Sequence, residues 1–380
     1  MNKAELDWLL SGPDFFKAAE SLISRARTVL HLQVYIFDYD QTGMEMLEQL
    51  EAASARGVSV YLLLDDFGSA GFAHRYKERC LKSGIRFRMF GHLTLSSRHP
   101  YGRRLHHKLI VADRREAVLG GINIADKYKG VQGKPWLDFG VHIVGEPAVQ
   151  LHEIAEALFN KQHVRLARIR STEYGLKDDH GRLLIRRNDW LVGRSEISRS
   201  YREAVSMASD DIMIVASYFL PGRRIKKRLE EAAARGVRIR FVMSSVSDIP
   251  LMRAASRFLY RWMMKSGMEI YEYQPGVVHG KVALVDDRWI TVGSYNLNHL
   301  SDYGSLEMNA EVDAPVHVKV FSEHLQWLMD NQCVRIRSVS HGGIGGHLSG
   351  MTDWLSYILM KAAESLLLFF TGKRKSDLGH

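Results

Sequence analysis

The sequence contains only two cysteines among its 380 residues, Cys80 and Cys333, and they lie far apart. Two isolated thiols provide neither a disulfide framework nor the paired spacing of a thiolate metal site, so we expect a reducing compartment. The amino-terminal stretch has no basic segment followed by an apolar run, which argues against a cleaved signal peptide. We therefore expect a chain that folds by burying apolar side chains.

Acidic residues are the second shortage, because 43 Asp and Glu stand against 52 Lys and Arg, for a net charge of +9. Such an excess favours an anionic partner, but nucleic acid and anionic lipid both qualify, and ordinary solubility explains the charge equally well. The hydrophobic share of 46% is that of a globular protein, and the length suffices for two ordinary domains.

One short pattern occurs twice, as "HHKLIVADRREAVLGGIN" from His106 and as "HGKVALVDDRWITVGSYN" from His279. The two copies align at a constant offset of 173 residues. The matched polar positions and glycines are His106 with His279, Lys108 with Lys281, Asp113 with Asp286, Gly120 with Gly293, and Asn123 with Asn296. At the same offset, Asp138 falls opposite Glu311. In a strand, His and Lys two residues apart point to the same side, an arrangement that suits an anionic substrate.

The duplication extends upstream of the motifs. Helix ends closed by glycine precede apolar runs in both halves, at "ARGVSVYLLLDD" and "ARGVRIRFVMSS" and again at "KSGIRFRMF" and "KSGMEIYEY". The first strand of each half is predicted at "VLHLQVYIF" and "IMIVASYFLP". Each half therefore reads as strand, helix, strand, helix, strand, the His-Lys strand and another strand, which predicts an α/β fold with a mixed sheet flanked by helices. The boundary is predicted near residues 171–182, a polar, turn-rich stretch.

These residues resemble the phospholipase D superfamily, whose signature is His-x-Lys, four residues, Asp, six residues and Gly-Ser-x-Asn. The second copy has this signature throughout, including Ser294, whereas the first copy carries Gly121 at the serine position. The resemblance extends from about Leu9 to Ile336. It implies two tandem, pseudo-twofold-related α/β domains (residues 1–175 and 176–337), followed by a tail (338–380).

Within the superfamily, "YIFDYDQTG", "GGINIADKY" and "GSYNLNHLSDYGSLEMNAEV" are similar to bacterial cardiolipin synthases that lack amino-terminal membrane spans. This resemblance implies a phosphatidyltransferase that joins two phosphatidylglycerol molecules and releases glycerol, without a metal or other cofactor. It also implies a peripheral enzyme on the cytoplasmic side of the bacterial inner membrane, with no nucleic-acid partner. The oligomeric state stays open.

The resemblance further implies a role for each motif residue. His106 attacks phosphorus to form a phosphohistidine and His279 is the general acid and base, although the near symmetry of the copies permits the reverse order. Lys108 and Lys281 hold phosphate oxygens, and Asn123, Asn296, Gly121 and Ser294 belong to the substrate-binding set. Asp138 and Glu311 are expected to orient the histidines. Asp113 and Asp286 belong to the catalytic motif, although capping of a turn describes them better than direct chemistry.

Two segments outside the motifs are candidate contact elements. The first half has a ten-residue excess ahead of its His-Lys strand, within "HLTLSSRHPYGRR", where Arg98, Arg103 and Arg104 are candidates for contacting a second phosphate. The stretch "RAASRFLYRWMMK" carries Arg253, Arg257 and Arg261 four residues apart, which predicts a basic helical ridge. Both segments also admit an ordinary solvated surface.

The tail is predicted to be a flexible link (338–350) followed by an amphipathic helix from Met351. One face of this helix is apolar, namely Leu355, Ile358, Leu359, Ala362, Leu366, Phe369 and Phe370. The opposite face carries Asp353, Ser356, Lys361 and Glu364, and these charges argue against a membrane span. A helix lying on an anionic bilayer fits the pattern, and so does a helix docked on the protein or pairing two protomers.

Three functions stay open at this point: a cardiolipin-forming phosphatidyltransferase, a hydrolase of the same superfamily (phospholipase D or nuclease), and a binding protein with an inactive site. Retention of His, Lys and Asn in both copies disfavours the inactive site. Two motifs in one chain and an amphipathic tail favour lipid over nucleic acid.

Overall fold

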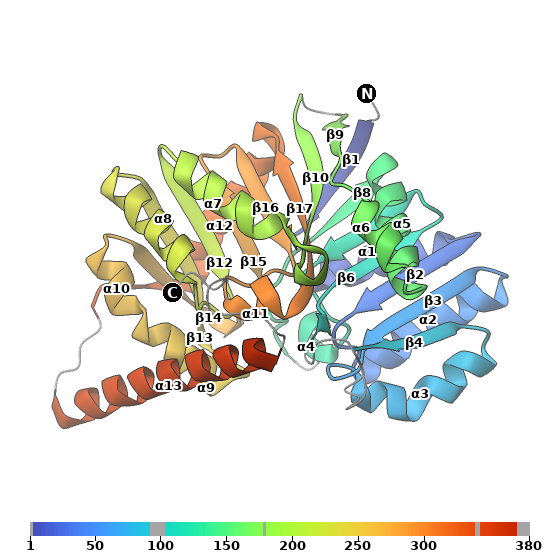
Figure 1. Ribbon diagram of the computed structural model, residues 1–380, viewed down its shortest axis with the longest axis horizontal. Coiled ribbons are helices and arrows are strands. Elements are labelled where there is room, and N and C mark those ends of the chain that lie inside the picture. The colour runs from blue at the N-terminus through green and yellow to red at the C-terminus, as the bar shows by residue number, and fades with distance from the viewer. Residues whose placement is uncertain (1–2, 92–102, 132, 178–179, 339–342, 371–380) are drawn as a thin grey trace.

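The computed structural model describes residues 3–91, 103–131, 133–177, 180–338 and 343–370. Figure 1 shows two α/β halves side by side, with helices on the outer faces of the strands. The predicted α/β fold with mixed sheets flanked by helices is confirmed. Among the described residues no helix is long and apolar enough to cross a membrane.

In the first half the strands lie in the order β4, β3, β2, β6, β7, β8, β1. The three parallel strands are β2 (Val29–Val34), β3 (Ser59–Asp65) and β4 (Arg86–Phe90). The antiparallel ones are β6 (Lys108–Ala112), β7 (Glu116–Gly120), β8 (Gly140–Val144) and β1 (Lys3–Leu9). The helices are α1 (Gly12–Arg25), α2 (Gln41–Ala55), α3 (Ala70–Lys82), α4 (Asp126–Lys129), α5 (Glu146–Phe159) and α6 (His163–Arg168).

The second half repeats this order as β14, β13, β12, β15, β16, β17, β10, with β18 added beside β14. Its strands are β10 (Arg182–Asp189), β12 (Asp211–Ala216), β13 (Arg238–Val246), β14 (Glu269–Val277), β15 (Lys281–Val285), β16 (Trp289–Gly293), β17 (Ser305–Asp313) and β18 (Cys333–Ile336). Its helices are α7 (Glu196–Met207), α8 (Arg223–Ala234), α9 (Pro250–Phe258), α10 (Tyr260–Lys265), α11 (His299–Tyr303) and α12 (Pro315–Gln332), with a short 3-10 turn at Trp190–Val192.

Helix ends follow the glycines that the sequence indicated. Gly57 and Gly236 stand just after α2 and α8, and both have φ of +91°, a conformation that costs glycine little. The strands β3 and β13 begin two residues later. In each half, a glycine that ends the helix therefore determines where the second parallel strand begins.

Short strands connect the two sheets. β9 (Glu173–Leu176) pairs with β1 on one side and β10 on the other, and β5 (Arg104–Leu105) of the first half pairs with β17 of the second. The stretch predicted as a turn-rich boundary is thus partly strand. β11 (Arg194–Ser195) extends the far edge of β10.

Apolar side chains form three buried clusters. One cluster lies between the halves and combines β6, β7 and β8 with β15, β16 and β17, covered by α5 and α12. The others lie beneath α1 and α2 in the first half and beneath α7, α8, α9 and α10 in the second. Because the central cluster is shared, the ends of β6 and β15 are held at fixed positions relative to each other.

The tail differs from the prediction at its start. Helix α13 runs from Gly343 to Phe370, so residues 343–350 of the predicted flexible link are helical, while 339–342 lie outside the described residues. Glycine in a helix costs only about 1 kcal/mol per residue, and a helix already packed on α9 offsets that cost. The helix itself lies along the lower edge of the molecule in Figure 1.

Candidate active site

The two motif histidines, His106 and His279, stand just ahead of equivalent central strands. Lys108 opens β6 and Lys281 opens β15, and each histidine precedes its lysine by two residues. The backbone N–H of His106 donates to Leu306 O at 3.0 Å, and that of His279 donates to Leu137 O at 2.8 Å. Each histidine is therefore fastened to a segment of the opposite half, which brings both motifs to one site between the halves.

A carboxylate from the opposite half contacts each imidazole. His279 Nδ1 lies 2.6 Å from Asp138 Oδ2, and His106 Nδ1 lies 2.8 Å from Glu307 Oε2. All four side chains are buried or nearly so, with Glu307 fully enclosed. A carboxylate on Nδ1 fixes the tautomer and leaves Nε2 as the nitrogen available for chemistry.

The structure corrects the prediction for Glu311. Its carboxylate forms two bonds of 3.1 Å with the guanidinium of Arg186 and does not hold a histidine. The acid that holds His106 is Glu307, because the second half is four residues shorter than the first between its motif and this strand. The backbone shows the same shift, since Gly121 donates to Phe139 O and Ser294 donates to Met308 O. The offset between the halves thus falls from 173 to 169 residues, a change that a constant offset could not reveal.

The glycine at position 121 and the serine at position 294 stand next to different acids, Asp138 and Glu307, respectively. A Cβ on Gly121 would lie 2.3 Å from Asp138 Oδ1, so the carboxylate of Asp138 occupies the space that a serine would need. In the second half, the Ser294 hydroxyl donates to Glu307 and accepts from Met308 N at 3.0 Å. The predicted substrate contact of Ser294 is therefore replaced by a contact that positions Glu307.

The lysines and asparagines surround the histidines. Lys108 Nζ donates to His106 O at 2.9 Å, and Lys281 Nζ lies 3.0 Å from His279 Nδ1 and 3.3 Å from Ser217 Oγ. Asn296 Oδ1 accepts from the same Ser217 hydroxyl at 2.7 Å. Asn123 accepts from Ile36 N at 3.1 Å and donates to the Tyr128 hydroxyl at 2.9 Å, so both ends of its amide are engaged.

Burial dominates the electrostatics of this site. It lowers the pKa of Lys108 to about 7 and that of Lys281 to about 8, although nearby carboxylates oppose the shift. Burial also lowers the pKa of His106, against the opposing charge of Glu307, and holds the pKa of His279 well below its usual value with help from Lys281. Asp138 shifts upward to a pKa of about 7, again chiefly through burial. The negative charge of a bound phosphate would favour the protonated forms of the two lysines and two histidines, and so raise their pKa values.

Asp113 and Asp286 lie at the other ends of β6 and β15, away from the histidines. The carboxylate of Asp113 accepts from the backbone N–H groups of residues 27–29, and that of Asp286 from those of residues 209–211. These bonds hold the pKa of each acid below its usual value even though burial acts the other way. Both acids thus tie a hairpin to the start of the first parallel strand. This confirms the turn-capping role expected for them and removes them from the catalytic set.

Aromatic rings that the sequence analysis did not single out enclose the histidines. Tyr35 packs edge-on against His106 at 5.1 Å between ring centroids, and Tyr128 packs against His279 at the same distance. Trp136 and Tyr218 lie about as near to His279, at 6.0 and 6.1 Å. Tyr35 directly follows β2 and Tyr218 lies two residues after β12, within runs that the sequence indicates only as apolar strands. These rings exclude water from the imidazoles.

The arginines of the inserted stretch have protein partners where the structure describes them. Arg103 contacts Asp189 Oδ2 at 2.6 Å and is buried, and Arg104 contacts Asp65 Oδ1 at 3.3 Å. Both therefore anchor their segment to neighbouring carboxylates, which matches neither of the two roles left open for them, a second-phosphate contact or a solvated loop. Arg98 lies outside the described residues.

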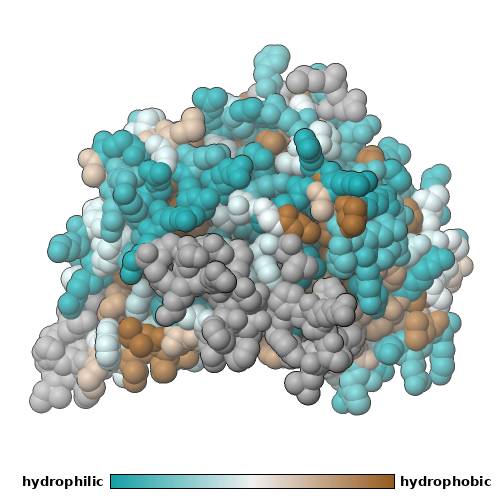
Figure 2. Space-filling model, in the orientation of Figure 1, coloured by the Kyte–Doolittle hydropathy of each residue, from teal (hydrophilic) through white to brown (hydrophobic). Residues whose placement is uncertain are grey.

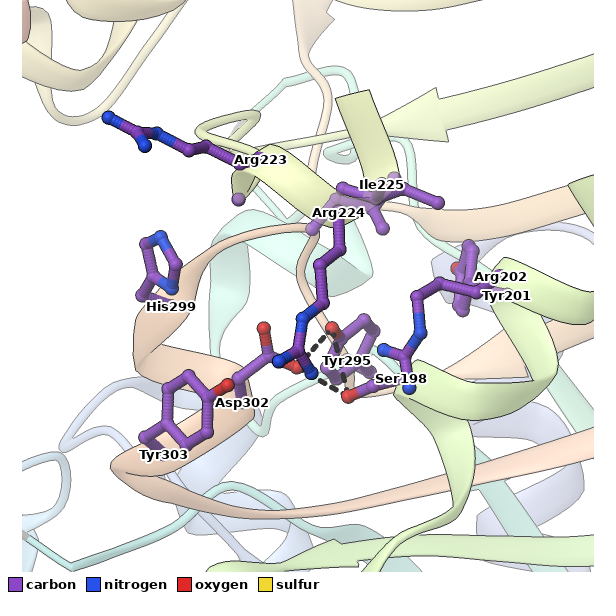
Figure 3. A pocket seen from close by; sticks show the side chains of 12 residues that line it. Ser198, Tyr201, Arg202, Arg223, Arg224, Ile225, Tyr295, His299, Asp302 and Tyr303 are labelled. Atoms are coloured by element: carbon purple, nitrogen blue, oxygen red, sulfur yellow. Dashed lines mark hydrogen bonds between the residues drawn. The ribbon is translucent and has the colours of Figure 1, made fainter. Parts of the chain in front are cut away.

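A small cavity adjoins the second motif. Figure 3 shows Tyr295, Ser198 and Asp302 bonded to one another there, beside Arg202 and Arg224. The Tyr295 hydroxyl donates to Asp302 Oδ1 at 2.7 Å. Since Tyr295 stands between Ser294 and Asn296, this bond braces the loop that carries the motif. No group of three or more potential metal ligands occurs within the described part of the chain.

Comparison with known proteins agrees with this geometry. The family described as "Cardiolipin synthase, PLD-like domain" matches residues 20–131 and 201–329. The chain belongs to this family. It is 31% identical to cardiolipin synthase B of Shigella flexneri over 332 residues, which cover 86% of this chain and 79% of that protein. It is 28% identical to cardiolipin synthase A of Pseudomonas fluorescens, over 86% of this chain and 67% of the relative.

A solved structure shows the same fold. The phosphatidylserine synthase of Haemophilus influenzae Rd KW20 superposes with a TM-score of 0.75 at 15% identity, covering 96% of this chain and 95% of that one. At this identity the likeness establishes the fold alone. The predicted phospholipase D fold and the predicted cardiolipin synthase-like family are both confirmed.

Glu307 and Glu311, both on β17, allow a test of which acid orients His106. We expect Glu307→Gln to lower kcat by about 10²–10³-fold, because His106 loses the charge that orients it. Glu311→Gln should leave kcat near the native value, since Glu311 contacts Arg186. The pH profile separates positioning from general damage, because only Glu307→Gln should shift the acid limb. Equal losses in both variants would contradict the assignment.

Proposed function

We propose that the protein is a phosphatidyltransferase that joins two phosphatidylglycerol molecules into cardiolipin and releases glycerol. The observation that carries the proposal is the site itself: two histidines each contact a carboxylate from the other half and a buried lysine of their own motif. Family membership and the names of the relatives support the lipid substrate.

In the first step, Nε2 of His106 attacks phosphorus of the first phosphatidylglycerol. The P–N bond forms, the P–O bond to glycerol breaks, and His279 donates a proton to the departing alkoxide. Burial lowers the pKa of both rings, so the assignment of His106 rests on access: its side chain keeps 14% exposure, against 6% for His279. His279 must bind its proton when the anionic substrate raises its pKa.

In the second step, His279 takes the proton from the glycerol hydroxyl of another phosphatidylglycerol. That oxygen attacks phosphorus, the P–N bond breaks, and cardiolipin forms while His106 regains its lone pair. Lys108 and Lys281 stabilise the charge that gathers on the non-bridging oxygens, and Asn296 is placed to donate to the same oxygens. Water at the acceptor position would give phosphatidic acid, which is the hydrolase alternative.

Lipid mass spectrometry with phosphatidylglycerol vesicles tests the proposal directly. Transfer produces cardiolipin and glycerol in equal amounts. Phosphatidic acid with glycerol would instead identify a phospholipase D, and hydrolysis of DNA without lipid turnover would identify a nuclease.

We expect activity to survive chelation by EDTA. The positive charge that phosphoryl chemistry requires comes here from Lys108 and Lys281, so no step needs a Lewis acid. The assay uses a dispersed short-chain substrate, because divalent ions also aggregate anionic vesicles. Loss of activity that one stoichiometric metal restores would contradict this expectation.

We place the enzyme peripherally on the cytoplasmic side of a bacterial inner membrane, where its proposed substrate resides. The proposed domain division assigns residues 1–175 and 176–337 to the two catalytic halves and 338–380 to the tail. Fractionation of cells that express a tagged protein, with and without a high-salt wash, tests the location.

A further inference from the structure

Helix α13 packs against the protein body with its polar side. Asp353, Ser356 and Glu364 are buried, with exposed fractions of 9%, 8% and 6%. The apolar side chains of Leu355 and Leu359, by contrast, keep 49% and 50% of their surface exposed. An amphipathic helix on a globular protein normally has the reverse orientation, with its apolar stripe toward the core.

Specific contacts hold the helix in this orientation. Lys361 Nζ donates to Leu220 O at 3.2 Å and lies 3.1 Å from Glu364 Oε2. The Tyr357 ring packs against Phe258 of α9 at 4.8 Å between centroids. Since polar atoms of the inner face have partners in the body, rolling the helix over would leave them without these bonds.

The outer side of α13 belongs to a larger apolar surface, which we call the α9/α13 face. Its exposed members are Ile249, Leu251, Phe258, Met351, Trp354, Leu355, Ile358 and Leu359. Figure 2 shows a hydrophobic area at the lower left, over α13. Clustered exposed apolar side chains of this kind mark an interaction surface rather than scattered surface residues.

Basic side chains of α9 and α8 lie beside the α9/α13 face. Arg253 and Arg257 of α9 line a groove that Asp353 of α13 closes, with Arg257 Nε 3.9 Å from Asp353 Oδ2. Arg261, the third member of the predicted ridge, belongs to the separate helix α10, so the three arginines do not form one helical ridge. Arg223 and Lys226 of α8 lie near the inner side of α13, close enough for their charges to interact with Tyr357 and Lys361, respectively. This arrangement is complementary to an anionic surface with an apolar interior.

We propose that the α9/α13 face docks on an anionic phospholipid bilayer, with the outer side of α13 in the interface and the flanking arginines and lysines at the headgroups. A second copy of the chain is a poorer occupant, because a twofold pairing of this face would oppose the basic flanks. The inference rests on the proposed function, which supplies a bilayer-resident substrate.

The docked helix is connected to the second motif by a short path. Lys361 bonds to Leu220 O, Leu220 N donates to Leu297 O at 3.1 Å, and Leu297 follows Asn296 of the motif. In Figure 1 the carboxyl end of α13 lies beside α11, close to where the two halves meet. Docking therefore places the site next to the lipid surface and lets a phosphatidylglycerol headgroup reach it with little displacement from the bilayer.

The double variant L355Q/L359Q tests the docking face. Vesicle sedimentation with phosphatidylglycerol should show binding weakened by at least about tenfold, because two leucines no longer gain from burial in the interface. Thermal unfolding should be unchanged, since both side chains face outward. The matched control V320Q/W327Q changes two equally exposed apolar residues of α12 and should bind as the native protein does.

Three further readouts make the result decisive. Binding to phosphatidylcholine vesicles should be much weaker than to phosphatidylglycerol vesicles, and turnover of a dispersed short-chain substrate by L355Q/L359Q should be native. Native vesicle binding by this variant would overturn the proposal, as would light scattering that shows a native dimer dissociated by it. Vesicle binding through this face without phosphatidylglycerol turnover would refute the proposed function and leave the docking face standing.

Discussion

Replacing Lys108 by methionine is expected to lower kcat by about 10²–10³-fold while leaving the folded protein at least as stable as the native one. Lys108 is only 1% exposed, and burial lowers its pKa to about 7. Without bound phosphate, the buried ammonium charge of Lys108 therefore lowers the stability of the folded protein. Methionine fills a similar volume and carries no charge. Lys82→Met, on an exposed position of α3, is the matched control and should change neither property.

The pH dependence of stability has a definite sign. Between about pH 7 and about pH 10.5, Lys108 is neutral in the folded protein and protonated in the unfolded chain. The unfolded state thus binds more protons, and native stability contributed by this residue rises with pH through that window. The Lys108→Met variant should lack this part of the rise in thermal unfolding scans. A variant that is markedly less stable than the native protein at pH 7 would show that the lysine is a structural element.

Replacing His279 by alanine is expected to divide substrates according to their leaving groups. With phosphatidylglycerol the loss should be about 10²–10⁴-fold, because glycerol alkoxide leaves poorly without a proton. With an activated phosphodiester whose leaving group needs no proton, headgroup release should be largely retained. His106→Ala should lose both reactions, since the nucleophile is gone. The reverse pattern, with His106→Ala retaining the activated reaction, would exchange the two roles.

The sequence predicted those parts of the site that repeat with a fixed spacing. His106, Lys108 and Asn123 and their counterparts were found because the motif contains no insertion. The continuous apolar runs KLIVA and KVALV placed each His-Lys pair at the start of a buried strand. Glu307 was not predicted, because the segment from Asn296 to Glu307 is four residues shorter than the equivalent segment from Asn123 to Asp138. The backbone bonds of Leu137 and Leu306 would have corrected the alignment, but such bonds between halves leave no mark in a single sequence.

Other features depended on tertiary packing. β1 and β10 are equivalent edge partners of β8 and β17, and the alternation of Ala4, Leu6 and Trp8 was a usable sign of the first of them. The faces of the tail helix followed from its periodicity. Which face would meet the protein did not, because that choice depends on Leu220 O and the aromatic ring of Phe258.

Rapid-quench trapping with phosphate-labelled phosphatidylglycerol, followed by peptide mapping under alkaline conditions, tests whether His106 forms the covalent intermediate. We expect a phosphatidyl group on His106 that forms and decays at rates consistent with turnover. Adding unlabelled phosphatidylglycerol should move the label into cardiolipin. Label on His279, or no covalent intermediate under any trapping condition while cardiolipin still forms, would contradict this mechanism.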